Sequence, residues 1–216
     1  VSLLVTGNAV DLSGVSFLNW NDSIIIAGGS SGTSTLVGSD QPETIIALGT
    51  STSTITGGRG ADQLLGAGGN DIFRYLNTVD AVAGETVDGG SGTDSIQIVG
   101  NASVSFEFVQ IDSIEQLRLP GAGAQAQFTG SQIGSSEIDQ VIGGRGVQTL
   151  VVTTDNQILD LLGVTFTTWD DTVDVINLFG SPGLQDILMG SDQADRIDGR
   201  DQADFMSGRG GNDTYF

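Results

Sequence analysis

The sequence predicts an all-β fold, a right-handed parallel β-roll or β-helix solenoid built on Gly-Asp turns. Two observations carry this prediction: apolar residues recur every nine positions, and glycine is abundant, with 33 among 216 residues. A nine-residue apolar period fits neither a helix nor a simple series of hairpins. It fits a solenoid in which each unit adds one short strand to a shared core. Repeated tight turns explain the glycine, which would weaken a helix.

The apolar period is clearest in three stretches of the chain. The nine-residue spacing joins Val37, Ile46, Ile55, Leu64 and Phe73, then Leu188, Ile197, Met206 and Tyr215, and more weakly Val141, Leu150 and Leu159. Each of these residues is expected to belong to a strand and to point into the core.

Charge and composition limit what the chain can bind. Seven basic against 27 acidic residues give a net charge of −20, so divalent cations are good partners, whereas nucleic acid and anionic membranes are poor ones. The absence of Cys and His excludes disulfides, zinc–thiolate sites and histidine-based catalysis. No apolar stretch is long enough to cross a bilayer, so membrane insertion is not expected. With 38% hydrophobic residues, the chain can still bury a core.

A second, longer repeat has a period of about 150 residues: segment 11–22 reappears as 160–171, and Gly38-Ser-Asp-Gln41 reappears as Gly190-Ser-Asp-Gln193. We therefore expect one full long unit, the first half of a second, and a chain that is a segment of a tandem array. The first, 1–147, comprises a strand-rich entry (1–29), a nonapeptide block (30–97) and a solenoid continuation (98–147). The second, 148–216, comprises an entry (148–180) and a nonapeptide block (181–216).

Seven nonapeptides share the pattern Gly-Gly-x-Gly-x-Asp-x-apolar-x, some with substitutions at the glycines. They span 57–65, 66–74, 89–97, 181–189, 190–198, 199–207 and 208–216, and their sixth residues are Asp62, Asp71, Asp94, Asp186, Asp195, Asp204 and Asp213. This pattern resembles the calcium-binding repeat of repeats-in-toxin (RTX) proteins. The resemblance implies a β-roll that binds several Ca²⁺ ions at its turns.

The chemistry of calcium agrees with this resemblance. Calcium prefers six to eight oxygen ligands, and glycine allows a turn to aim backbone carbonyls at one point. Besides the seven aspartates, the predicted metal-site residues are Gly58, Gly60, Gly90, Gly92, Gly199, Gly208 and Gly210, with Asp192 and Asp201 at position three. The resemblance implies that these last two contribute mainly carbonyls.

The resemblance also implies which aspartates share an ion. In the family two nonapeptides make one coil, and the ion lies between a nonapeptide and the next but one. Asp186 is therefore expected to pair with Asp204, and Asp195 with Asp213. Asp62 is expected to pair with Asp94 if residues 75–88 bulge out, which leaves Asp71 beside Ser53.

Several repeats keep the apolar period but lose the acid. On the spacing, Thr35, Thr44, Ser53 and Gln148 occupy position six of 30–38, 39–47, 48–56 and 143–151. These units are expected to coil, with polar side chains forming hydrogen bonds in place of calcium. Calcium is thus expected to be dense in 181–216, sparser around 57–97 and largely absent from 30–56 and 98–180.

The remaining segments show strand patterning. Alternation within 96–135 predicts buried Val104, Phe106, Phe108, Ile114, Leu117 and Leu119. Trp20 and Trp169 recur at equivalent places beside turn acids; they are interpreted as core or capping aromatics, with a calcium or carbohydrate contact as the alternative. Glu85 and Asp88 are interpreted as turn acids.

Three functions remain open. The first is a non-enzymatic structural segment of a secreted or cell-surface protein, such as an adhesin stalk, surface layer or filament, exported by a type I-like route. Its partners would be calcium ions and neighbouring repeats or further copies of itself. The second is an accessory calcium module of a larger secreted enzyme or toxin. The third is ice binding, for which Thr33, Thr35, Thr44, Thr52 and Thr54 are too irregularly spaced.

Overall fold

The computed structural model describes residues 2–134 and 137–216, and these form short parallel β-strands with no helix among them. In this described part no segment therefore has the form of a membrane-spanning helix. The chain divides into two compact units. Unit 1 contains the residues up to Gln97 together with Phe108–Glu115, and unit 2 contains Ile98–Glu107 with Gln116–Phe216.

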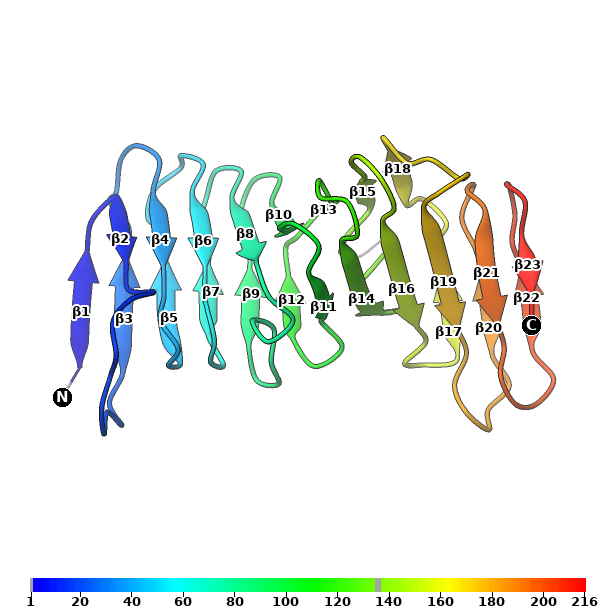
Figure 1. Cartoon of the computed structure of the whole chain (residues 1–216), viewed down its shortest axis with the longest axis horizontal. Helices are drawn as coiled ribbons and strands as arrows, with labels where there is room; N and C mark the ends of the chain where they lie inside the picture. Colours follow the sequence, from blue (N-terminus) through cyan, green and yellow to red (C-terminus); the bar gives the residue numbers. More distant parts are fainter. Residues whose placement is uncertain (1, 135–136) are drawn as a thin grey trace. The chain divides into compact units, whose positions relative to one another are not determined.

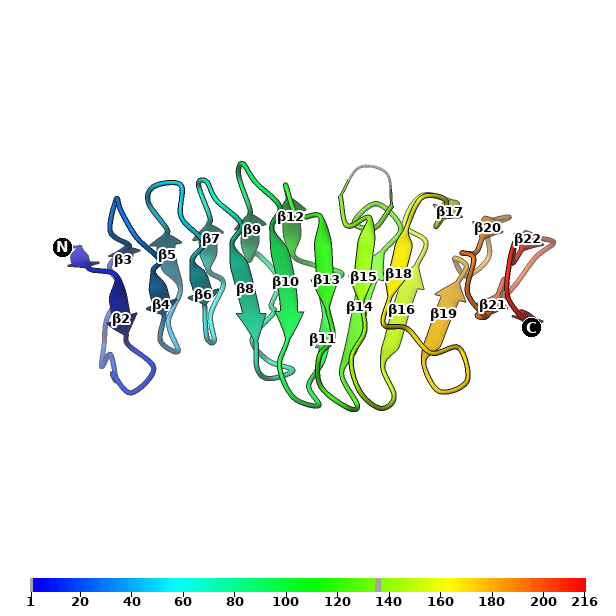
Figure 2. The same ribbon diagram turned by 90° about the horizontal axis from the view of Figure 1, so that it is seen from above.

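Unit 1 consists of two parallel sheets whose strands alternate along the chain (Figure 1, Figure 2). One sheet has the order β1-β3-β5-β7-β9-β12 and the other contains β10-β8-β6-β4-β2. The strands are β1 (Leu3–Thr6), β2 (Ala9–Asp11), β3 (Ile24–Ala27), β4 (Thr35–Val37), β5 (Glu43–Ile46), β6 (Thr54–Thr56), β7 (Gln63–Leu65), β8 (Ile72–Tyr75), β9 (Thr86–Asp88), β10 (Ser95–Ile98) and β12 (Gln110–Asp112). Successive strands thus belong to opposite sheets, as coils of a solenoid require.

Unit 2 repeats this arrangement with three runs of parallel strands, β11-β14-β16-β19-β21-β23, β13-β15-β18 and β17-β20-β22. Its strands are β11 (Ser103–Ser105), β13 (Gln116–Arg118), β14 (Gln125–Thr129), β15 (Gln140–Ile142), β16 (Thr149–Thr153), β17 (Ile158–Asp160), β18 (Thr165–Thr167), β19 (Val175–Phe179), β20 (Ile187–Met189), β21 (Asp195–Asp198), β22 (Phe205–Ser207) and β23 (Thr214–Tyr215). The predicted all-β parallel solenoid is confirmed in both units.

The core consists of ladders of identically placed apolar side chains. In unit 1 the register stacks Leu36, Ile55 and Phe73 in one sheet and Ile26, Ile45, Leu64 and Val87 in the other. In unit 2 it stacks Phe128, Val152, Leu178 and Ile197. All these residues are 0–1% exposed. Because side chains alternate across a strand, each short strand supplies one or two such residues and turns its others outward.

Most of the predicted strand patterning in 96–135 agrees with the structure, with one exception. Val104, Phe106, Ile114, Leu117 and Leu119 are buried, as expected. Phe108 is 76% exposed, whereas Val109 is buried. The expectation for Phe108 is therefore wrong, because a turn follows Phe106 and the alternation stops there.

The outward faces do not carry a regular threonine array. Thr35 is paired with Thr54, but the next residue in this row is Ile72 and the preceding one is Ala9. Thr44 is paired with Gln63 in the other sheet. The threonines therefore do not form the flat ladder that ice binding needs.

The stacked pair Phe106–Phe128 provides a test of the core. The two rings lie 4.8 Å apart at an interplanar angle of 5°, and both are fully buried. Phe128→Ala is expected to lower the free energy of unfolding of the calcium-saturated protein by roughly 3–5 kcal/mol. Urea unfolding followed by circular dichroism measures this loss. The control Phe108→Ala should change stability by less than about 0.5 kcal/mol, and equal losses in the two variants would contradict the assigned core.

Candidate functional site

The nonapeptide turns combine left-handed and ordinary backbone at fixed positions. Positive φ angles occur at position two in Gly58, Ala67, Gly90, Arg200 and Arg209, and at position four in Gly60, Gly69, Gly92, Gln202 and Gly211. Glycine is the residue best suited to such angles, which explains its frequency at these positions. The alternation folds six residues into a compact loop between two strands.

The acids at position six form ladders along the edges of the coils. In each rung, the backbone N–H of one position-six residue donates to a carboxylate oxygen in the next coil. The N···O distances are 2.8 Å for Glu43–Asp62, 2.6 Å for Ser53–Asp71, 2.6 Å for Asp71–Asp94, 2.8 Å for Asp186–Asp204 and 3.1 Å for Asp195–Asp213. One oxygen of each acceptor carboxylate is thus used by the backbone, and the other remains for a different partner.

The first glycine of a repeat lies where two oxygens converge. A Cβ atom at Gly66 would collide with both Asp71 Oδ2 and the carbonyl oxygen of Gly89 in the next coil. The same pairing recurs at Gly190, with Asp195 and Gly208, and at Gly180, the residue just before repeat 181–189, with Asp186 and Gly199. The position-six carboxylate of one coil therefore faces a turn carbonyl of the next across a space that only glycine leaves open.

Four position-six aspartates each have one carboxylate oxygen without a hydrogen-bond partner among the described residues. These oxygens are Asp62 Oδ2, Asp71 Oδ2, Asp94 Oδ2 and Asp186 Oδ1, and their side chains are 0–2% exposed. A buried, ionised oxygen without a hydrogen bond is costly unless a cation neutralises it. In residues 2–134 and 137–216 no three acidic side chains gather at one point, so the other ligands of a cation here would be backbone carbonyls. Hard oxygen donors of this kind fit calcium.

Burial also shifts the protonation of these acids. It raises the pKa of Asp62 to about 7, that of Asp195 to about 7 and that of Asp94 to about 6. Loss of hydration is the largest cause in each case, and the backbone N–H bonds oppose it only partly. A bound divalent cation would favour the ionised forms, because it supplies the missing opposite charge.

Several predicted site residues lie where the sequence placed them. Asp186 neighbours Asp204 and Asp195 neighbours Asp213 in successive coils. Asp192 and Asp201 are exposed, which suits a contribution through their carbonyls. Gly199 and Gly208 are the first residues of their turns, and each lies against its own position-six aspartate. Gly210 approaches the backbone of Asp192, and Gly58, Gly60, Gly90 and Gly92 adopt positive φ angles. Their role as calcium ligands stays a prediction.

The predicted pairing of Asp62 with Asp94 is wrong. Residues 75–88 do not bulge out as a whole, because their last three residues form β9, which pairs with β7. Asp94 therefore accepts the N–H of Asp71, while Glu85 precedes β9 as Asp62 precedes β7. The expected neighbour of Asp71 on its other side, Ser53, is confirmed.

The assignment of Thr35 and Thr44 to position six is also wrong. The register places Leu36 and Ile45 inward, so position six falls on the buried residues Ser34 and Glu43. Ser53 and Gln148 do occupy position six, and both are buried. The long repeat contained the correct frame, because aligning Gly38 with Gly190 places Glu43 on Asp195.

Gln148 shows how a repeat without the acid is satisfied. Its side-chain Nε2 donates to the carbonyls of Arg145 (3.0 Å) and Gly121 (3.4 Å), and its Oε1 accepts the N–H of Gly144 (3.2 Å). The amide thus forms hydrogen bonds with turn carbonyls, as the sequence predicted for such repeats; the absence of calcium at this turn stays a prediction. Asp174, which the sequence analysis did not identify, accepts the N–H of Gln148 at 2.8 Å.

Glu85 is more than a turn acid. It is 1% exposed, accepts the Tyr75 hydroxyl at 2.5 Å, and its other oxygen, Oε2, has no partner among the described residues. Burial raises its pKa to about 8. No sequence motif marks it, because its neighbours do not follow the nonapeptide pattern. By contrast, Asp88 is half-buried at the end of β9.

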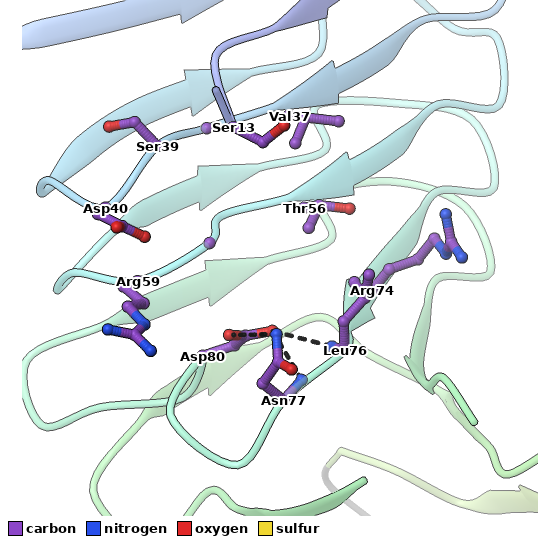
Figure 3. Close-up of a pocket in the computed structure, with 12 residues that line it drawn as sticks. Ser13, Val37, Ser39, Asp40, Thr56, Arg59, Arg74, Leu76, Asn77 and Asp80 are labelled. Carbon is purple, nitrogen blue, oxygen red and sulfur yellow. Dashed lines mark hydrogen bonds between the residues drawn. The ribbon is translucent and has the colours of Figure 1, made fainter. Parts of the chain in front are cut away.

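A pocket of about 280 Å³ on unit 1 does not add a cation site (Figure 3). Its buried acid, Asp80, accepts the N–H groups of Leu76 and Asn77 at 2.9 Å. Arg59 and Arg74 also line this pocket, and Arg74 extends away from Asp80 in the view. The Asp80 carboxylate therefore serves to order its own loop.

The two tryptophans pack against phenylalanines three residues earlier. The ring centroids lie 5.8 Å apart for Phe17–Trp20 and 5.3 Å apart for Phe166–Trp169. Trp20 Nε1 also donates to the carbonyl of Asp22 at 2.6 Å. Both tryptophans are only half-buried, so they are not core residues, and their role as capping aromatics stays a prediction.

Comparison with known proteins identifies the repeats. Residues 45–73 and 184–215 match the family model described as the RTX calcium-binding nonapeptide repeat, in four copies. No curated protein and no solved structure matched the chain. The two matched segments include Asp62, Asp71 and all four position-six aspartates of 181–216, whereas 89–97 lies outside them. The chain therefore contains RTX calcium-binding nonapeptide repeats, folded as a parallel β-roll.

Proposed function

We propose that the chain is a calcium-dependent structural segment of an extracellular or cell-surface repeat protein, and that it is not a catalyst. The observation that carries this proposal is the set of buried, unpartnered carboxylate oxygens of Asp62, Asp71, Asp94 and Asp186. RTX repeats are typical of proteins exported by type I secretion, which supports an extracellular location. Neighbouring repeats or further copies of the chain are its expected partners, in an adhesin stalk, surface layer or filament.

The folding of such a segment would respond to calcium. With a net charge of −20, the chain repels itself when calcium is scarce, as inside a cell. Calcium binds where the turns of successive coils meet, and those sites exist only after the coils form. Binding is therefore coupled to folding, so that millimolar calcium outside the cell would drive the transition.

Circular dichroism with and without chelator tests this proposal. Removing calcium at neutral pH is expected to abolish most of the β signal, and restoring it to about 1–10 mM is expected to bring the signal back. Equal ionic strength supplied as magnesium or sodium chloride is the control, because general charge screening would act in all three salts. A β signal that survives chelation unchanged would overturn the proposal.

The alternative is an accessory module of a larger secreted enzyme or toxin. The calcium response would be the same in both cases, because the same turns would bind the ions. The recurrence of segment 11–22 as 160–171 favours the structural role, since tandem long units are typical of repeat scaffolds.

A further inference from the structure

The turn at Ser113–Glu115 occupies the place of a nonapeptide turn in unit 1, although it has only three residues. Strand β12 pairs with β9, so that Asp112 lies beside Asp88. The six-residue turn 89–94 follows Asp88, and the short turn follows Asp112. Ser113 has a φ of 57°, the left-handed backbone that longer turns adopt at positions two and four. One such residue suffices to reverse the direction of its carbonyl.

The short turn reproduces the oxygen pair found at the glycines of the repeats. A Cβ atom at Gly89 would collide with the carbonyl oxygen of Ser113 and with Asp94 Oδ2. At Gly66 the corresponding atoms are the carbonyl oxygen of Gly89 and Asp71 Oδ2. Ser113 therefore supplies the carbonyl that the first glycine supplies in the nonapeptides.

Glu115 completes the ladder of acids above Asp94. The N–H of Asp94 donates to Glu115 Oε2 at 2.7 Å, as the N–H of Asp71 donates to Asp94 Oδ1 at 2.6 Å. The N–H of Glu115 in turn donates to the carbonyl of Asp94 at 3.2 Å. Asp94 is fully buried, and its Oδ2 has no hydrogen-bond partner among the described residues. Asp94 Oδ2 and the Ser113 carbonyl thus converge at Gly89, and the Glu115 carboxylate lies beside the backbone of Asp94 in the adjacent coil.

We propose that Asp94, Glu115 and the carbonyl oxygen of Ser113 form an additional calcium-binding site, which uses a three-residue turn in place of the nonapeptide. The proposal rests on the proposed function, because it assumes that the neighbouring turns bind calcium. It goes beyond the matched repeats, since residues 89–115 lie outside both matched segments. The longer side chain of Glu compensates for the shorter turn, because it carries the carboxylate further from the backbone.

The experiment counts calcium ions bound to the full chain by equilibrium dialysis and isothermal titration calorimetry. Glu115→Gln keeps the size of the side chain and removes its charge, so we expect it to bind one ion fewer than the unaltered chain. Asp112→Asn is the matched control. It makes the same charge change three residues away on an exposed side chain, so its count should equal that of the unaltered chain. Circular dichroism in excess calcium verifies that both variants fold.

The additional site and the proposed function would be contradicted by different results. An unchanged ion count and affinity in Glu115→Gln would overturn the additional site and leave the nonapeptide sites intact. An equal loss in Asp112→Asn would also overturn it, because the effect would then come from net charge. Absence of calcium binding in the unaltered chain would overturn the proposed function itself. Terbium bound beside Asp94 in an anomalous difference map would support the site directly.

Discussion

Asp71→Asn is expected to raise the calcium concentration at the folding midpoint at least about tenfold, equivalent to about 1.4 kcal/mol. Asp71 is the central rung of its ladder: it accepts the N–H of Ser53 and donates its own N–H to Asp94. Its side chain is fully buried, and Oδ2 faces the Gly89 carbonyl across Gly66 without a partner. Asparagine keeps the shape but removes the charge that would hold the ion. A calcium titration followed by circular dichroism measures the midpoint.

Without calcium, Asp71→Asn should not impair folding and should instead favour it. Burial raises the pKa of Asp71, which means that its charge opposes folding when no cation is bound. Asp71→Asn should therefore leave the calcium-free chain at least as structured as the original. Asp40→Asn, on an exposed turn residue, controls for net charge and should shift neither state appreciably. A variant that folds at the original calcium midpoint would rule out Asp71 as a ligand.

Calcium-free protein is expected to lose β structure as the pH rises from about 5 to about 8. The pKa values of Asp94, Asp62, Asp195 and Glu85 rise from near 4 to about 6, 7, 7 and 8 in the folded chain. Over this interval the folded state binds more protons than the unfolded one, so stability falls with increasing pH. Summed over these groups, the loss is on the order of several kcal/mol. Protons thus substitute for calcium at low pH.

Circular dichroism in chelator across this pH range measures the effect. The measurements should stay above the isoelectric point of about 4.1, because a net charge near zero promotes association. Calcium at about pH 8 should restore the β signal, because it neutralises the ionised carboxylates. A calcium-free chain that becomes more ordered as the pH rises would contradict the raised pKa values and the burial that causes them.

The nonapeptide turns could be predicted from the sequence because they are local structures. The pattern around Asp186, Asp195, Asp204 and Asp213 runs without interruption, so counting two repeats per coil places the correct acids together. Position eight also points inward in most repeats, as the burial of Leu64, Phe73 and Ile197 shows, although Tyr215 in the last repeat is 49% exposed. In 181–216, two nonapeptides in the sequence therefore correspond to one coil of the structure.

The frame of the first repeats could not be predicted from apolar spacing. Ile45 and Ile46 are adjacent and equally apolar, as are Leu36 and Val37, so either member of each pair satisfies a nine-residue period. A one-residue slip exchanges the two faces of a strand. The core selects Ile45, and this selection moves Glu43 to position six in place of Thr44.

By itself, the sequence determined the fold class, the period of the coils and the chemistry of the turns, because these depend on glycine backbone freedom, alternating apolar residues and carboxylates at a fixed spacing. Only the tertiary structure decided which acids are neighbours. Insertions such as 76–84 change the number of residues per coil without changing the order of coils, so sequence distance no longer measures distance in space. For this reason Asp71 meets Asp94, and Glu115 meets Asp94 from a turn that has no nonapeptide at all.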